Sequence, residues 1–146
     1  MLIKIKPFNK SQQSEVIKLW TDCGLVAPQN NPLEDIRRKS KVNPELFLVA
    51  LSGKKLIGTV MAGYEGHRGW INYLAVDPTQ RKLGLGRQLM AEAEKRLKKM
   101  GCPKINLQIR ESNAEVRAFY ERIGFTQDKA VSYGKRLAQD AKTGKR

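Results

Sequence analysis

Apolar and polar residues alternate with a period of two in several short segments of the chain. Residues 2–7 alternate apolar and basic side chains and end at a proline, a pattern typical of a half-buried strand. Residues 46–64 form two β-rich runs around a Ser-Gly-Lys-Lys turn, which predicts a hairpin. Residues 65–69 then turn the chain into a third run, 70–76. Three consecutive strands are therefore expected before residue 77.

Other segments repeat their apolar residues at helical spacing. Asn9 and Gln12 have the spacing of a capping box before a run of apolar residues that ends at Cys23. Asn31-Pro32 predicts the start of a second helix that ends near Ser40. Residues 86–100 and 113–124 each carry one apolar stripe and are each closed by a glycine. The pattern thus predicts four helices.

Two further strands are expected in the second half of the chain, at 104–110 and at 131–137. The order is strand, two helices, three strands, helix, strand, helix and one or two strands. Such an order predicts an α/β fold with one mixed, mostly antiparallel sheet of six to seven strands and about four helices on both faces. We expect one domain over residues 1–140 and a basic, disordered tail over 141–146.

Composition narrows the classes of protein that remain. A chain of 146 residues fits one domain, and two cysteines without partners at metal-ligand spacing favour a reduced, cytoplasmic setting and no metal site. No apolar run reaches the roughly 18 residues of a membrane span. The net charge of +14 favours an anionic partner: nucleic acid, a phosphorylated cofactor or an acidic protein.

The segment "VDPTQRKLGLGRQ" carries the most specific chemistry. A strand ending at Val76, followed by Gly84 and Gly86 and then a helix, places unpaired backbone N–H groups and the positive end of a helix dipole at one point. Phosphate binds well there, because the glycines let an anion approach and basic residues surround the turn. The glycines could also serve only a tight turn. The sequence of this segment matches neither a P-loop motif nor a dinucleotide-binding fingerprint.

The segment does contain the motif Arg81-x-x-Gly84-x-Gly86, which is preceded by "LAVDP" and followed by "ESNAEVRAFYERIGF". Here the chain resembles the GNAT superfamily of N-acetyltransferases, and segments such as "GTVMAGYEGHRG" and "GCPKI" resemble its small YpeA-type branch. The resemblance spans nearly the whole chain. It implies an acyltransferase that moves the acetyl group of acetyl-CoA to an amine by direct attack in a ternary complex.

The resemblance also assigns roles to individual residues. It implies that the backbone of Leu74, Ala75 and Val76 pairs with the pantetheine arm and polarises the thioester, and that Tyr120 stands near the sulfur. Tyr120 would be the general acid, since its phenol, with a reference pKa of about 10, is protonated at neutral pH. The other implied cofactor-binding residues are Arg81, Lys82, Leu83, Gly84, Leu85, Gly86, Arg87 and Asn113. Asn113 is equally suited to capping its helix, and Tyr120 to a place in the core.

The general base is not evident. A glutamate found in the ribosomal-protein alanine N-acetyltransferases is replaced here by Gln108, and one found in histone-type members is replaced by Trp70. An amide orients water but accepts no proton. The candidates for a base or an acceptor site are Glu65, His67, Gln108 and Glu111, although exposed or capping roles also suit the two glutamates and the histidine.

Two alternatives come from other functional classes. A catalytically weak sensor of acetyl-CoA would share the fold and lack the carboxylates. A basic nucleic-acid-binding module is disfavoured, because no helix-turn-helix, zinc or RNP-like signature is present and only 7% of residues are aromatic. The acceptor, a small molecule or a protein amine, is expected to contact residues 20–31 and 129–133. Residues 131–137 could end the sheet of a monomer or pair across a homodimer.

Overall fold

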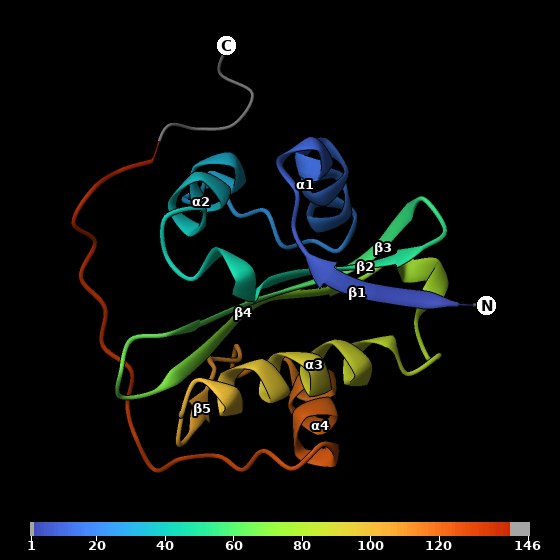
Figure 1. Ribbon diagram of the computed structural model, residues 1–146. Helices are drawn as coiled ribbons and strands as arrows, with labels where there is room; N and C mark the ends of the chain where they lie inside the picture. The colour runs from blue at the N-terminus through green and yellow to red at the C-terminus, as the bar shows by residue number, and fades with distance from the viewer. Residues whose placement is uncertain (1, 141–146) are drawn as a thin grey trace.

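A five-stranded sheet separates two helical layers in the computed structural model, which describes residues 2–140 (Figure 1). Helices α1 and α2 cover one face, and α3 and α4 cover the other. The strand order is β1-β2-β3-β4-β5, antiparallel throughout except for the parallel pair β4 and β5. The strands are β1 (Ile3–Pro7), β2 (Phe47–Ser52), β3 (Lys55–Tyr64), β4 (Gly69–Val76) and β5 (Ile105–Asn106). The predicted fold class, a mixed sheet with helices on both faces, is confirmed. The predicted tail 141–146 lies outside the described residues.

The helices begin where the capping residues predict. Asn9 and Gln12 form the capping box: the Asn9 N–H donates to Gln12 Oε1 at 2.8 Å, and the Ser11 N–H donates to Asn9 Oδ1 at 2.9 Å. Asn31 caps the next helix by accepting from the Leu33 N–H at 3.0 Å. The helices are α1 (Gln13–Asp22), α2 (Pro32–Lys39), α3 (Leu85–Lys99) and α4 (Ala114–Arg122), with short 3-10 turns at Lys10–Gln12, Pro44–Leu46 and Pro78–Gln80.

Each face of the sheet buries its own hydrophobic cluster. The face under α3 and α4 packs Leu89, Met90 and Leu97 against the inward side chains of β2 and β3. The opposite face buries Trp20 and Ile36 of α1 and α2. Because β3 is covered on both faces, its sequence is a nearly continuous apolar run and does not alternate. Among residues 2–140, no helix is long and apolar enough to span a bilayer.

The sheet has five strands among the described residues, where the sequence predicts six or seven. Segment 107–110 continues the direction of β5 without a ladder, and segment 131–137 forms no strand. Val131, Tyr133 and Leu137 are 82%, 92% and 90% exposed. The physical reason is that segment 131–137 makes no backbone hydrogen bond to β5 or to segment 107–110 and is joined to the latter by the side-chain bond from Gln108 Nε2 to Ser132 Oγ at 2.5 Å. An alternating pattern cannot form a strand where no backbone partner is within reach.

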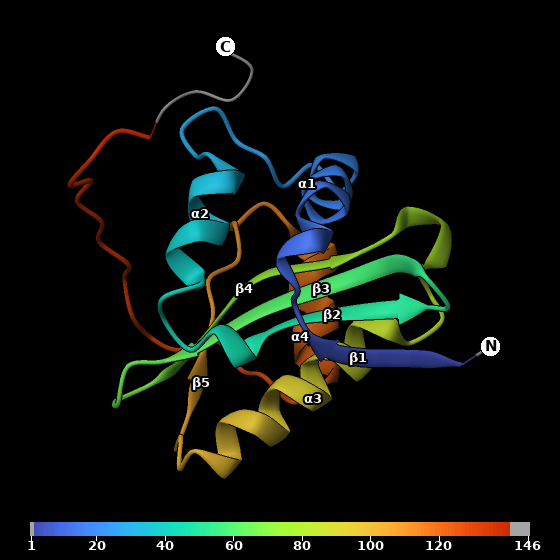
Figure 2. The same ribbon diagram turned by 45° about the horizontal axis from the view of Figure 1, so that its top comes forward.

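A β-bulge in β4 determines where the molecule opens. Thr59 pairs with Ala75 and Met61 with Asn72, so two residues of β4 lie opposite one residue of β3. One of them, Tyr73, has a φ of 51°, in the left-handed region. β4 pairs with β5 only at its first two residues, Gly69 and Trp70. Beyond that point the chain after β5 leaves β4, as Figure 2 shows, and a cleft opens between them.

Candidate active site

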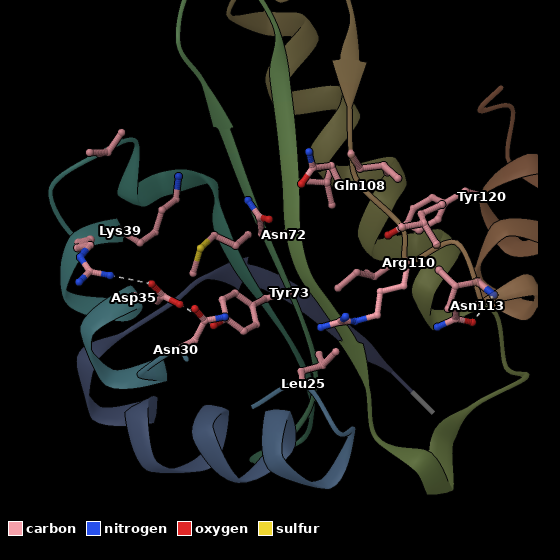
Figure 3. A pocket seen from close by; sticks show the side chains of 18 residues that line it. Leu25, Asn30, Asp35, Lys39, Asn72, Tyr73, Gln108, Arg110, Asn113 and Tyr120 are labelled. Carbon is pink, nitrogen blue, oxygen red and sulfur yellow. Dashed lines mark hydrogen bonds and ion pairs between the residues drawn. The ribbon is translucent and has the colours of Figure 1, made fainter. Parts of the chain in front are cut away.

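The cleft between the bulge of β4 and segment 107–110 has a volume of about 690 Å³ (Figure 3). One wall comes from β4, α2 and the loop before α2, and the other comes from segment 107–110 and α4. Its lining residues are Leu25, Asn30, Asp35, Arg38, Lys39, Val42, Met61, Ile71, Asn72, Tyr73, Leu74, Leu107, Gln108, Ile109, Arg110, Asn113, Val116 and Tyr120. A cavity of this size suits a small ligand.

The second half of β4 offers an edge without a strand partner. Ala75 and Val76 pair with β3 on one side, whereas no strand within residues 2–140 pairs with them on the other. Leu74, one residue earlier, lines the cleft. The structure therefore brings the three predicted pantetheine-binding residues to an open sheet edge, where an extended ligand could pair with the backbone.

The turn after β4 leads into an uncapped helix. Asp77 Oδ1 accepts from the Thr79 N–H at 2.9 Å, and this bond lowers the pKa of the Asp77 carboxyl. Lys82 and Gly84 both have left-handed backbones, with φ values of 70° and 80°. Gly84 is the N-cap of α3, where no side chain accepts a hydrogen bond from the first turn and no acidic residue lies in that turn. The first N–H groups of α3 are thus open to an anion.

The two glycines of this turn lack a side chain for different reasons. A Cβ at Gly84 would meet nothing within 4 Å, so the backbone there faces open space in a conformation that favours glycine. A Cβ at Gly86 would lie 3.3 Å from the ring of Phe119. Gly86 therefore serves the packing of α3 against α4, and Gly84 is the position that leaves room for a ligand.

Tyr120 belongs to the core and to the cleft at once. The residue is only 7% exposed, and its ring packs edge-to-face against Phe119 and Phe125, with centroids 5.0 and 5.5 Å away. Its side chain points into the cleft (Figure 3), and its hydroxyl makes no hydrogen bond to any described residue. Burial raises the pKa of Tyr120 to about 12. Asn113 caps α4 by accepting from the Val116 N–H at 3.1 Å, and it also lines the cleft.

A second tyrosine, which the sequence did not single out, lies on the opposite wall. The Tyr73 hydroxyl donates to Asp35 Oδ2 at 2.6 Å, and its ring stacks on Trp20 with centroids 3.8 Å apart. Trp20 Nε1 donates to Thr59 Oγ1 at 2.9 Å, and Thr59 Oγ1 donates to the Tyr73 carbonyl at 2.9 Å. Burial and the Asp35 carboxylate raise the pKa of Tyr73. This network fixes the bulge.

The remaining residues of the α2 wall were also missed. Asp35 and Lys39 are four residues apart in a helix whose start Asn31 fixes, so they share one face of α2. That spacing was readable in the sequence. The fact that this face meets β4 through Asp35 and β3 through Lys39 was not, because it depends on how the helix packs on the sheet and on the position of the bulge.

The structure places one of the four candidates for a base, Gln108, at the cleft and the other three outside it. Glu65 and His67 lie in the turn between β3 and β4, outside the residues that line the cleft. The Glu65 carboxylate accepts from the N–H groups of His67 and Arg68 at 2.5 and 2.6 Å, which lowers its pKa. Glu111 lines a neighbouring groove together with Trp70, and Gln108 lines both that groove and the cleft. Within the described part of the chain, no cluster of side chains could hold a metal ion.

Comparisons with known proteins match the chain over most of its length. The model of the acetyltransferase (GNAT) family matches residues 12–125. A Yersinia enterocolitica protein described as an acetyltransferase is 43% identical over 138 residues, which cover 94% of this chain and 98% of that protein. A Yersinia pestis protein described as an uncharacterized N-acetyltransferase is 42% identical, with the same coverage. In the solved structure of the NatC complex bound to Gag peptide and CoA, one chain matches with a TM-score of 0.76 and 27% identity, over 88% of this chain and 87% of that chain.

Proposed function

Because this chain belongs to the acetyltransferase (GNAT) family and is an acyltransferase, we propose that it transfers the acetyl group of acetyl-CoA to a primary amine by direct attack in a ternary complex. The observation that supports this most strongly is the cleft itself. It has an open backbone edge on one wall and an unbonded, protonated phenol on the other. Both groups are needed when a thioester is attacked and a thiolate departs.

Acetyl-CoA would lie along β4 and reach the N-terminus of α3. The edge at Leu74, Ala75 and Val76 would pair with the pantetheine arm, as a strand pairs with an extended peptide. The segment Arg81–Arg87 would hold the pyrophosphate through the uncapped N–H groups of α3 and its basic side chains. Gly84 allows that approach, because a side chain there would project into the open space above the turn. Asn113 would contact the cofactor beyond this turn.

The transfer itself needs few groups. The amine nitrogen attacks the thioester carbonyl carbon, and the resulting oxyanion is stabilised by a backbone N–H on the β4 edge. The carbon–sulfur bond then breaks, and Tyr120 donates its proton to the departing thiolate. The amine must lose its own proton, and the Gln108 amide, which lines the cleft, orients the water that receives it. Tyr120 is protonated throughout the neutral range, so its proton is present when the thiolate departs.

The test is a transfer assay that follows two products. The protein is incubated with acetyl-CoA and a panel of primary amines, and free CoA is measured with a thiol reagent while mass spectrometry identifies the acetylated amine. Amine-dependent release of CoA, matched by acetylated product, is the expected result. Tight binding of acetyl-CoA without release in the presence of any amine would instead favour a sensor of acetyl-CoA, the function that the missing base carboxylates would suit.

A further inference from the structure

We propose that the amine acceptor is a small molecule that carries an anionic group, a carboxylate or a phosphate, and that Arg110 binds this group. The inference rests on the acetyl transfer proposed above and names the class of its acceptor. It comes from the charges that line the cleft, from the bonds those charges already make and from the direction of the Arg110 side chain.

Arg110 is a cation without a partner. It follows β5 and extends across the cleft toward Leu25 and Tyr73, as Figure 3 shows. Its side chain is exposed and makes no hydrogen bond or ion pair with any residue from 2 to 140. The other arginine of the cleft, Arg38, is held by Asp35 at 3.1 Å and by Asp140. Arg110 alone therefore offers a free guanidinium, whose planar fork suits carboxylate and phosphate oxygens.

The one acid in the lining of the cleft is already engaged, and Arg110 makes no ion pair with Glu94, Glu111, Glu121 or Asp128 of the neighbouring groove that it also lines. Asp35, Arg38, Lys39 and Arg110 are the charged residues in its lining. The Asp35 carboxylate already accepts from the Tyr73 hydroxyl and from Arg38. Lys39 is buried, and its Nζ donates to the Ala62 carbonyl without forming an ion pair within the described chain. Besides Arg38, which is paired, Lys39 and Arg110 are thus two cations without an acid of their own in the lining, and an anionic ligand would balance them.

The same charges explain how the amine could lose its proton without a carboxylate base. Positive groups nearby disfavour a third positive charge, so they lower the pKa of an ammonium that enters the cleft. A larger fraction of the acceptor is then the neutral amine that attacks the thioester. The same positive groups would repel an amine that carries no negative group, so such an amine would bind weakly. An anionic group bound to Arg110 removes that penalty and leaves the amine end free.

The position of Arg110 separates this site from the expected pyrophosphate site. The pyrophosphate is assigned to the N-terminus of α3, while Arg110 points toward the loop before α2. That end of the cleft is bounded by the C-terminal segment, because Asp140 binds Arg38 and Arg136 Nη2 donates to Asn30 Oδ1 at 3.5 Å. The cleft of about 690 Å³ must also hold the acetyl end of the cofactor. The space that remains beside the acetyl end suits a small amine.

The experiment compares amines in matched pairs. γ-Aminobutyrate is paired with butylamine, and phosphoethanolamine with ethanolamine, so that the two pairs distinguish a carboxylate from a phosphate. We measure kcat and KM for each amine at saturating acetyl-CoA, in the wild type, in Arg110→Gln and in Arg122→Gln. Arg122, an exposed residue on α4 outside the cleft, is the matched control for the loss of one positive charge. Calorimetric titration of acetyl-CoA into each protein is measured in parallel.

The expected result is a preference for the anionic member of at least one pair. Arg110→Gln should reduce that preference about tenfold, since a charge-assisted hydrogen bond contributes roughly 1.5 kcal/mol or more. The loss should appear in KM, while the affinity for acetyl-CoA and the rates of Arg122→Gln stay near wild type. A preference for the neutral amines, equal effects of the two substitutions, or no turnover of either pair despite acetyl-CoA binding would overturn the inference. Failure of the wild type to bind acetyl-CoA would overturn the proposed function itself.

Discussion

The two walls of the cleft each carry a tyrosine, and the two hydroxyls differ in what they contact. On the β4 wall, the Tyr73 hydroxyl donates to Asp35 and its ring stacks on Trp20. On the α4 wall, the Tyr120 ring is held by Phe119 and Phe125, and its hydroxyl has no partner among the described residues. Both pKa values are raised, in Tyr120 by burial and in Tyr73 also by a neighbouring carboxylate.

This difference separates a structural tyrosine from a chemical one. Tyr73 uses its proton to fix a strained backbone position, since it has a positive φ within the bulge. The Tyr120 hydroxyl donates no hydrogen bond to a described residue, so its proton remains available to a ligand. Residue type and burial alone would not distinguish the two. The partner of the hydroxyl does.

Removing the free hydroxyl should have the largest effect on catalysis. We expect Tyr120→Phe to lower kcat by about 10² to 10⁴, the usual contribution of a general acid. The affinity for acetyl-CoA should stay within about twofold, since the ring and its packing remain. Steady-state kinetics and calorimetry on the same preparation check this. If kcat were unchanged, Tyr120 would be a core residue only.

The buried phenol should also make the fold sensitive to alkali. The pKa of Tyr120 is about 12 in the folded protein and about 10 in an unfolded chain, so the folded state binds more protons between these values. The contribution of Tyr120 to the free energy of unfolding is therefore fully present below pH 10. It is lost as the pH rises to 12, which lowers the free energy of unfolding by roughly 2 to 3 kcal/mol. Urea unfolding across this range should show a shallower decline in Tyr120→Phe than in the wild type. Identical slopes would contradict the assignment.

The network on the other wall should matter for stability. Thr59→Val leaves the buried Trp20 N–H without its acceptor and removes the bond to the Tyr73 carbonyl, which should lower the free energy of unfolding by about 1 to 3 kcal/mol. Urea denaturation measures the change. Thr126→Val, at an exposed threonine outside this network, is the control and should stay within about 0.5 kcal/mol of wild type. Equal stability of both variants would show that the network does not hold the bulge.

The smallest effect is expected at the tyrosine that is already bonded. Tyr73→Phe removes one hydrogen bond, while Asp35 keeps its bond to Arg38 and the ring keeps Trp20. We expect a loss of about 1 kcal/mol in unfolding free energy and a kcat within about threefold of wild type. A fall in kcat as large as that of Tyr120→Phe would contradict the assignment of a structural role to Tyr73 and a catalytic role to Tyr120.

The sequence predicts the parts of the molecule that depend on neighbouring residues. Asn9 and Asn31 mark helix starts because capping is local, and Gly84 marks the turn before α3 because its backbone is left-handed. The bond between Asp35 and Tyr73 could not be predicted, since it spans 38 residues and depends on the bulge. The strand expected at 131–137 was wrong, because alternation says nothing about whether a backbone partner is present.

The most direct test of the account compares the two ends of α3. Gly84 and Gly101 both have left-handed backbones, with φ values of 80° and 89°, and a Cβ at either would meet nothing within 4 Å. Gly84→Ala and Gly101→Ala should therefore lose similar stability, on the order of 1 kcal/mol. Calorimetric titration of acetyl-CoA should show tight binding to the wild type and to Gly101→Ala, and binding at least about tenfold weaker to Gly84→Ala. Equal affinities in both variants, or no binding to the wild type, would contradict the claim that acetyl-CoA binds at the N-terminus of α3.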